Sequence, residues 1–127
     1  MSPKIQASCV EVKNSPLHGR GLYAAEPFRK GRRIGVYPLL ILSAADTKRL
    51  SKTRLYHYVF FVDENEQGAM RAGVAFGMIS MCNHSSTPNA AFIVDPVKEI
   101  VTLKAARGIK AGAEILIDYG DFAEKAI

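Results

Sequence analysis

The sequence predicts a mostly-β domain with one or two short helices. Short apolar and β-branched runs, such as 5–12 and 34–42, recur along the chain. Turn signals rich in Gly, Pro and Asn, for example at 14–16 and 110–112, separate these runs. The length of 127 residues fits a single domain, 1–127, and an apolar content of 48% is ordinary for a protein with a packed core.

Each expected element follows from a local signal. The run at 34–42 has the apolar, β-branched character of a buried strand, which Pro38 is expected to break or bend. Ser43, followed by Asp46 three residues later, forms a capping pattern that predicts a short helix ending near Lys52. The remaining expectations are strands at 22–24, 56–63 and 114–118, a hairpin of 91–94 with 100–103, and a polar loop over 83–89.

Apolar segments are too short to cross a membrane. The longest, 34–45, contains Tyr37, Pro38 and Ser43, whereas a spanning helix needs roughly 20 apolar residues. The first nine residues contain one lysine and no hydrophobic region of the kind found in signal peptides. We therefore expect a cytoplasmic or nuclear protein that is not secreted and does not contact a membrane.

The two cysteines argue against a zinc cluster and against a disulfide framework. Cys9 and Cys82 form no CxxC pair and are far apart in the sequence. We expect both to behave as small hydrophobic residues in the core. No His, Asp and Glu grouping indicates another metal, so we expect no metal site.

The chain is basic, with a formal net charge of +5 and a pI near 9.4. Clustered basic residues attract phosphate groups, but they can equally form an ordinary solvated surface. No aromatic residues alternate with them as a base-stacking platform would require. The basic residues form two clusters: Arg29, Lys30, Arg32 and Arg33, then Lys48, Arg49, Lys52 and Arg54.

Three segments carry residue types suited to a binding or catalytic site. Gly19-Arg20-Gly21 lets a backbone approach a ligand closely, although it can also be a simple turn. The polar run 83–89 is rich in donors and acceptors that can hold a polar small molecule or cap one another in a turn. Tyr119 is at the end of an expected strand and before a glycine. Its hydroxyl either lies near the opening of a site, or the residue only packs and forms a hydrogen bond.

In this order, GRG, NHSxxPN and EIxIDYG resemble the SET domain of protein lysine methyltransferases. The resemblance extends from about Ser15 to Phe122 and is strongest to compact bacterial and viral members without cysteine-rich flanking modules. It implies a β-clip-like fold of small curved sheets with a C-terminal pseudoknot. It also implies methyl transfer from S-adenosyl-L-methionine to lysine, with S-adenosyl-L-homocysteine as product.

The resemblance assigns roles to individual residues. Tyr119 corresponds to the tyrosine facing the transferred methyl, Tyr58 to a wall of the lysine channel, and Phe92 to the position that sets methylation degree. A phenylalanine there implies di- or trimethylation. The donor-binding residues that it implies are Gly19, Arg20, Gly21, Asn83, His84 and Phe122.

Several positions depart from the family pattern. Ser80 stands where an Arg or Lys is usual, Ser86 where a Cys is frequent, and Val36 where an acidic residue often precedes the tyrosine. These departures leave open a catalytically inactive SET-like binding module. A small basic β-domain that binds nucleic acid is a third alternative, and it predicts salt-dependent binding without donor affinity.

The resemblance also indicates partners. We expect a protein substrate with an exposed lysine, such as a histone or another DNA-associated basic protein, with a ribosomal protein as an open alternative. The basic clusters suggest contact with DNA. The small size of the domain and its short C-terminal segment suggest a homodimer, in which one subunit covers an exposed edge of the other.

Overall fold

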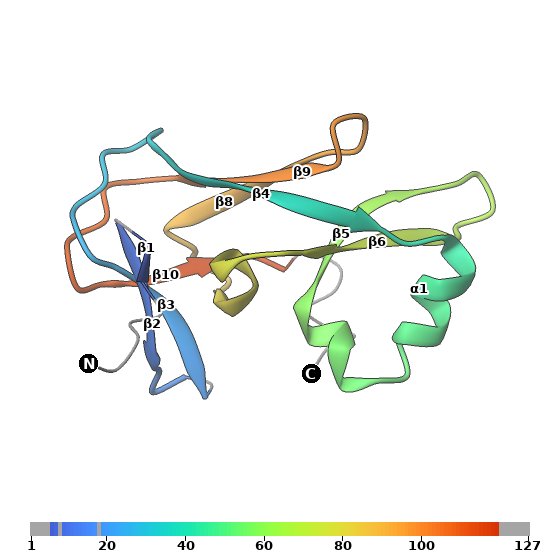
Figure 1. The fold of residues 1–127 in the computed structure, drawn as a ribbon, viewed down its shortest axis with the longest axis horizontal. Helices are drawn as coiled ribbons and strands as arrows, with labels where there is room; N and C mark the ends of the chain where they lie inside the picture. Colours follow the sequence, from blue (N-terminus) through green and yellow to red (C-terminus); the bar gives the residue numbers. More distant parts are fainter. Residues whose placement is uncertain (1–5, 8, 18, 120–127) are drawn as a thin grey trace.

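The computed structural model describes residues 6–7, 9–17 and 19–119, and these residues form two five-stranded sheets and short helical segments (Figure 1). The elements in chain order are β1 (Gln6–Ala7), β2 (Val10–Asn14), β3 (Arg20–Ala24), β4 (Arg33–Ile41), α1 (Ala44–Leu50), the 3₁₀ helix η1 (Arg54–Tyr58), β5 (Val59–Glu64), β6 (Met70–Ala75), the 3₁₀ helix η2 (Met78–Met81), β7 (Asn83–His84), β8 (Ala90–Asp95), β9 (Ile100–Ala105) and β10 (Glu114–Ile117). The predicted mostly-β class with short helices is confirmed.

Each sheet pairs strands that are far apart in the sequence. One has the order β1-β2-β3-β10-β7, and the other has the order β5-β6-β4-β9-β8. In the first, β10 pairs antiparallel with β3 and parallel with β7. The last described strand therefore lies between two segments of the N-terminal and central parts of the chain.

Strand β4 continues through Pro38, so of the two outcomes expected from the sequence, a break or a bend, the break does not occur. It pairs with β9 from Arg33 to Pro38 and with β6 from Leu39 to Ile41. Proline lacks an N–H and is tolerated where the ladder needs none. Pro38 stands where β4 changes partner, and it still contributes its carbonyl, which accepts from the Phe76 N–H at 2.9 Å.

The helix after β4 forms where the capping pattern predicts it. The Ser43 Oγ accepts a hydrogen bond from the Asp46 N–H at 3.1 Å, as a serine N-cap does. The helix ends at Leu50, slightly before the expected end. Residues 54–58 then form a 3₁₀ helix, so the strand expected from 56 begins at Val59.

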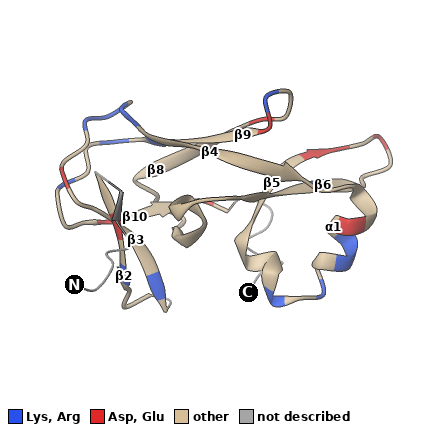
Figure 2. Cartoon of the chain, viewed as in Figure 1, with Lys and Arg blue, Asp and Glu red and all other residues tan. Residues whose placement is uncertain are grey.

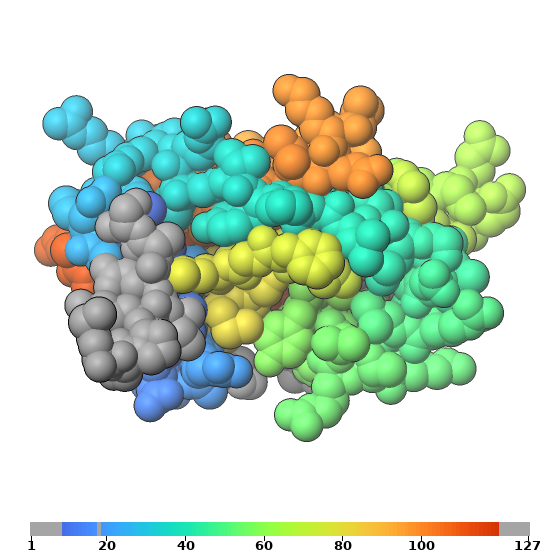
Figure 3. Space-filling view, viewed as in Figure 1, coloured from blue at the N-terminus to red at the C-terminus, as the bar shows by residue number. Residues whose placement is uncertain are grey.

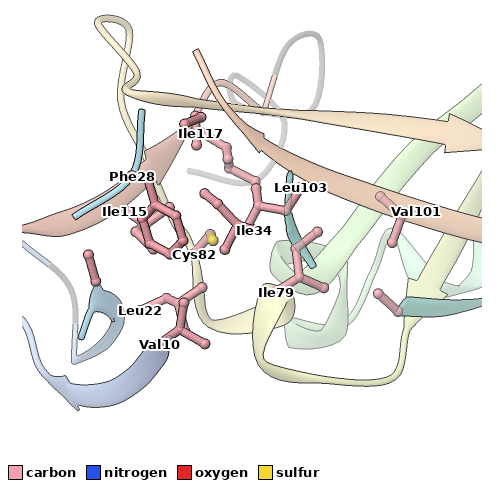
Figure 4. Close-up of a cluster of buried hydrophobic side chains, with 14 of the residues drawn as sticks. Val10, Leu22, Phe28, Ile34, Ile79, Cys82, Val101, Leu103, Ile115 and Ile117 are labelled. Carbon is pink, nitrogen blue, oxygen red and sulfur yellow. The ribbon is translucent and has the colours of Figure 1, made fainter. Parts of the chain in front are cut away.

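A single apolar cluster joins the two sheets (Figure 4). Leu22, Ile115 and Leu103, from β3, β10 and β9, are fully buried, and so is Ile79 from η2. These side chains hold β3 and β10 against the second sheet. No helix within the described residues is long and apolar enough to cross a membrane.

Candidate active site

Strand β10 brings the three polar motifs of the sequence together (Figure 1). Ile115 lies opposite Leu22 of β3, which directly follows the Gly-Arg-Gly segment. On the other edge, Leu116 and Ile117 lie opposite Asn83 and His84. The three motifs, which the sequence keeps apart, therefore meet at the β3–β10–β7 junction.

Asn83 and Glu114 form the polar centre of this junction. The Asn83 Nδ2 donates to the Glu114 Oε2 at 2.8 Å and to the Arg20 carbonyl at 3.1 Å. The Glu114 Oε1 accepts from the Ser15 hydroxyl at 2.9 Å and, more weakly, from the Tyr23 hydroxyl at 3.4 Å. Glu114 thus fixes the orientation of the Asn83 amide and ties the junction together, rather than facing a reaction site.

The two glycines of the Gly-Arg-Gly segment have different surroundings. A Cβ atom on Gly21 would lie 2.3 Å from the Glu114 Oε2 and 3.1 Å from the Asn83 Nδ2, so a side chain there would force the Glu114 carboxylate or the strand to move. Gly19 has a φ of +40°, and a Cβ there would meet no atom within 4 Å. Gly21 therefore allows close packing, and Gly19 exposes backbone that no side chain covers.

Asn89, the last residue of the polar run, attaches β10 to the rest of the site. Its Nδ2 donates to the Glu114 carbonyl at 2.8 Å, and its Oδ1 accepts from the Leu116 N–H at 2.8 Å. The Asn89 side chain therefore makes the hydrogen bonds with this part of β10 that a neighbouring strand would otherwise make. Asn89 was noticed in the sequence because it belongs to the polar run. The sequence could not reveal its hydrogen bond with Leu116, which is 27 positions away.

Tyr119 is held by two hydrogen bonds after β10. Its hydroxyl donates to the Cys82 carbonyl at 2.7 Å, and its backbone N–H donates to the His84 Nδ1 at 2.9 Å. The rings of His84 and Tyr119 are 5.1 Å apart between centroids. His84 also lies 3.7 Å from the Asp118 carboxylate. The phenol is thus fixed immediately beside the Asn83–His84 segment.

The environment of Tyr119 keeps its phenol protonated. Burial, followed by the neighbouring Cys82 thiol and Tyr58 phenol, raises the pKa of Tyr119 to about 12. Tyr58, at the end of η1, is 48% exposed. The exposed Tyr58 is therefore close enough to the more buried Tyr119 to contribute to the raised pKa of its phenol.

A third tyrosine, Tyr37, belongs to the same surroundings and was given no role from the sequence. Burial, followed by the thiols of Cys82 and Cys9, raises its pKa to about 12. A Cβ on Gly35 would lie 2.5 Å from its hydroxyl, and one on Gly77 would lie 2.4 Å from its ring. Tyr37 thus fills a slot that two glycines leave open, which no local sequence pattern reveals.

The remaining two residues singled out from the sequence are Phe92 and Phe122. Phe92 lies on β8 in the second sheet, packed edge-to-face against Phe60 with 5.0 Å between ring centroids. It packs against the same core cluster as Tyr37 and Tyr119. Phe122 lies outside the described residues. In the part of the chain that the structure describes, no group of three or more His, Cys, Asp or Glu residues is arranged to hold a metal ion.

Comparisons with known proteins agree on one family. The model of the SET domain matches residues 19–120. The histone-lysine N-methyltransferase specific for H3 lysine-37 from Schizosaccharomyces pombe is 30% identical over 115 residues, covering 90% of this chain and 75% of that protein. The N-lysine methyltransferase KMT5A-A of Danio rerio is 28% identical over 118 residues, covering 86% of this chain and 34% of that protein, so this chain spans about a third of its length.

Solved structures show the same fold. A putative histone methyltransferase of Plasmodium falciparum superposes with a TM-score of 0.70 at 22% identity, covering 91% of this chain and 96% of that one. A humanized Polycomb Repressive Complex 2 from Chaetomium thermophilum, bound to the inhibitor GSK126, contains a region with a TM-score of 0.70 at 24% identity, covering 91% of this chain and 15% of that one.

Proposed function

The chain belongs to the SET-domain family and is a protein-lysine N-methyltransferase, and we propose that it transfers a methyl group from S-adenosyl-L-methionine to the side-chain amine of lysine in a protein. The observation that carries this proposal is the junction of β3, β7 and β10. It brings Gly21, Asn83 and Tyr119 together, with the Tyr119 phenol fixed to the Cys82 carbonyl.

The described residues fit the proposed donor. Gly19 offers backbone with a φ of +40° and open space where a side chain would be. Nearby, Asn83 is 8% exposed and has its amide oriented by Glu114 and Arg20, so that a polar ligand would meet a preset group. The bound donor supplies an electrophilic methyl group on a positively charged sulfur. Arg20, Gly21 and His84 complete the proposed donor-binding set, together with Phe122.

Tyr119 orients the reacting groups and is not a general base. Its proton is engaged with the Cys82 carbonyl, which leaves the lone pairs of the phenol oxygen directed elsewhere. A pKa of about 12 keeps the phenol neutral at physiological pH. A fixed oxygen can accept from the substrate amine or face a partly positive methyl carbon, which stabilises charge developing in the transition state.

The nucleophile must be a neutral amine. A free lysine has a pKa near 10.4, so losing its proton at neutral pH costs about 4 kcal/mol. The proposed channel beside Tyr58 would disfavour the ammonium form by desolvation, and a neighbouring positive sulfur would disfavour it further. Fixing the substrate amine against the bound donor would then supply most of the acceleration.

The substrate we propose is a lysine in a histone or another DNA-associated basic protein. The fission yeast relative is named for histone H3, and it aligns with most of this chain. We propose that the enzyme works in the cytoplasm or nucleus and also contacts DNA near its substrate. The phenylalanine at position 92 leads us to propose di- or trimethylation as the outcome.

We further propose a homodimer. Val36 of β4 and Ile93 of β8 both lie opposite Thr102, so they share a sheet face with Leu40, four residues beyond Val36. These three side chains are 43–52% exposed. A second copy of this small domain would cover them. Light scattering at micromolar concentration should give twice the monomer mass, and monomer alone would contradict the dimer.

The direct test of the proposed function is transfer of label. The purified protein and its Tyr119→Phe variant are incubated with radiolabelled S-adenosyl-L-methionine and a panel of basic proteins, including histones. We expect label on a lysine with the wild-type protein and its loss with the variant. If calorimetry detects no donor binding and no protein is labelled, the proposal is wrong. Donor binding without labelling would favour the inactive binding module.

A further inference from the structure

Two loops that are distant in the sequence form one end of the molecule. The segment 26–33 leads into β4, and the segment 104–110 leaves β9. A bridge between Phe28 and Ile109 joins them. The Gly31 N–H donates to the Ala105 carbonyl at 2.8 Å, and the Ala105 N–H donates to the Arg32 carbonyl at 2.9 Å. Backbone bonds therefore hold the two segments side by side in a fixed arrangement.

This end of the molecule is strongly basic (Figure 2). The structure adds three basic residues from the second segment to the cluster that the sequence shows in the first. We call the following set the basic end: Arg29, Lys30, Arg32, Arg33, Lys104, Arg107 and Lys110. The space-filling view shows the first segment, in blue to cyan, standing at the surface (Figure 3).

The basic end carries all of the net positive charge of the chain. Its seven basic residues are accompanied in the two segments by one carboxylate, Glu26. The chain has 17 basic and 12 acidic residues, so the rest contains ten basic and eleven acidic residues and has no net positive charge. The charge is therefore concentrated at one end rather than spread over a solvated surface.

Within the structure, most of these charges have no acidic partner. Arg32 pairs with Glu26 at 2.7 Å, whereas no ion pair between described residues engages Arg29, Lys30 or Arg33. Arg33 lies directly opposite Lys104 in the β4–β9 ladder. Like charges in this cross-strand position destabilise a sheet. An external anion between them would remove that repulsion.

We infer that the basic end is a docking surface for the phosphate backbone of duplex DNA. This inference rests on the proposed function, because it assigns the proposed DNA contact to particular residues. Phe28, the aromatic residue within the two segments, is buried at 2% exposure and offers no face for stacking an unpaired base. Charge without exposed aromatic side chains favours the regular phosphates of a duplex over a single strand.

The basic end lies away from the proposed wall of the lysine channel. Figure 1 shows the loop before β4 at one end of the long axis and α1 at the other, and η1 packs next to α1. Tyr58, the proposed wall of the lysine channel, is the last residue of η1. DNA bound at the basic end therefore leaves this side of the protein free for a flexible tail of a DNA-bound protein.

The test measures binding of a fluorescein-labelled random-sequence duplex by anisotropy over a range of salt concentrations. One variant carries Arg29→Gln, Lys30→Gln, Arg33→Gln and Lys104→Gln. The matched control loses four positive charges near α1 and carries Lys48→Gln, Arg49→Gln, Lys52→Gln and Arg54→Gln. Circular dichroism and melting curves establish that both variants fold.

We expect the variant of the basic end to lose about tenfold or more in affinity and to show a shallower dependence on salt. The log–log slope should decrease by roughly 0.9 for each DNA phosphate that the variant no longer neutralises. The control should lose much less affinity. Equal losses in both variants, no binding by the wild-type protein at low salt, or tighter binding of the single strand would overturn the inference.

Failure of the proposed function would look different. Anisotropy is measured without donor or protein substrate, and transfer to a DNA-free substrate is measured separately on the same proteins. DNA binding through the basic end by a protein that transfers no methyl supports the inference and contradicts the proposed function alone. Normal transfer with DNA binding unchanged by the four substitutions contradicts the inference alone.

Discussion

The Tyr119 hydroxyl donates a hydrogen bond to the Cys82 carbonyl, with 2.7 Å between the two oxygens. Cys82 directly precedes Asn83, whose amide is set by Glu114 and Arg20. The phenol and the proposed donor-binding asparagine are therefore positioned by one short segment. A shift of β7 relative to β10 would change the position of Asn83 relative to Tyr119, so the packing of these strands controls the geometry proposed for catalysis.

The first prediction concerns the Tyr119 hydroxyl. Tyr119→Phe removes a fixed oxygen from the proposed reaction centre, and we expect kcat to fall about 10²–10³-fold, as when a preorganised polar group is removed. Loss of one hydrogen bond should cost only about 1 kcal/mol of stability. Steady-state kinetics and thermal melting measure the two effects.

Tyr23→Phe is the matched control for this substitution. The Tyr23 hydroxyl donates to the Asn14 carbonyl at 3.1 Å and lies 3.4 Å from the Glu114 carboxylate. The same chemical change is thus made in the same sheet but away from the proposed reaction centre. We expect kcat to stay within about threefold of wild type, and equal losses in both variants would argue that Tyr119 has a structural role only.

The second prediction concerns pH. Since the pKa of Tyr119 is raised to about 12, its phenol remains almost fully protonated up to about pH 10. The free substrate lysine, with a pKa near 10.4, should instead dominate kcat/KM, which is expected to rise about tenfold per pH unit up to about pH 10. A falling limb between about pH 8 and 10 that Tyr119→Phe abolishes would contradict the neutral role of the phenol.

Local signals in the sequence were sufficient for some elements and insufficient for others. The Ser43 cap depends on neighbours three residues apart, and the helix forms there. The strand Asn83–His84 was expected to be loop, because a two-residue strand has no periodicity and its partner β10 lies more than thirty residues away. The 3₁₀ helix ending at Tyr58 was expected to be strand, because short apolar runs do not distinguish the two.

The candidate site was only partly visible in the sequence for the same reason. The sequence motifs pointed to Gly21, Asn83 and Tyr119, and the fold brings these residues together. The surroundings of Tyr37 depend on Gly35 and Gly77, which lie on different elements. Lys104 and Arg107 lie far in the sequence from the first basic cluster; Lys104 joins it through the β4–β9 ladder, opposite Arg33, and Arg107 through the bridge between the two loops.

The third prediction concerns Gly21. An alanine there would place its Cβ 2.3 Å from the Glu114 Oε2, so either the carboxylate or the backbone of β3 must move. We expect Gly21→Ala to destabilise the fold by about 1–3 kcal/mol, as overpacking does. In Gly108→Ala, the new Cβ meets nothing within 4 Å, and its melting temperature should equal or slightly exceed that of wild type. Equal melting temperatures for the two variants would contradict this packing argument.

The fourth prediction concerns the number of methyl groups. If Phe92 lies where we propose, beside the proposed reaction centre, a hydroxyl introduced by Phe92→Tyr can hold a water molecule there and so reduce the space for further methyl groups. We expect the wild-type enzyme to accumulate di- or trimethyl-lysine and the variant to stop earlier, as measured by mass spectrometry after long incubation. Because Phe92 packs against Phe60, melting curves must show that both proteins remain folded. A wild-type product with only one added methyl group would contradict the proposed degree of lysine methylation.

The last prediction concerns Asn89. Asn89→Ala leaves the Glu114 carbonyl and the Leu116 N–H without the bonds that fix β10, and each missing partner costs about 1–3 kcal/mol in a partly buried site. We therefore expect a clearly lower melting temperature and weaker donor binding by calorimetry, since β10 also aligns Asn83. Asn65 provides the control, because its Oδ1 accepts from the Gln67 and Ala69 N–H groups in an exposed turn. Water can replace those two bonds, so Asn65→Ala should melt nearly as wild type does. If both variants lose the same stability, the attachment of β10 by Asn89 is not what holds the junction together.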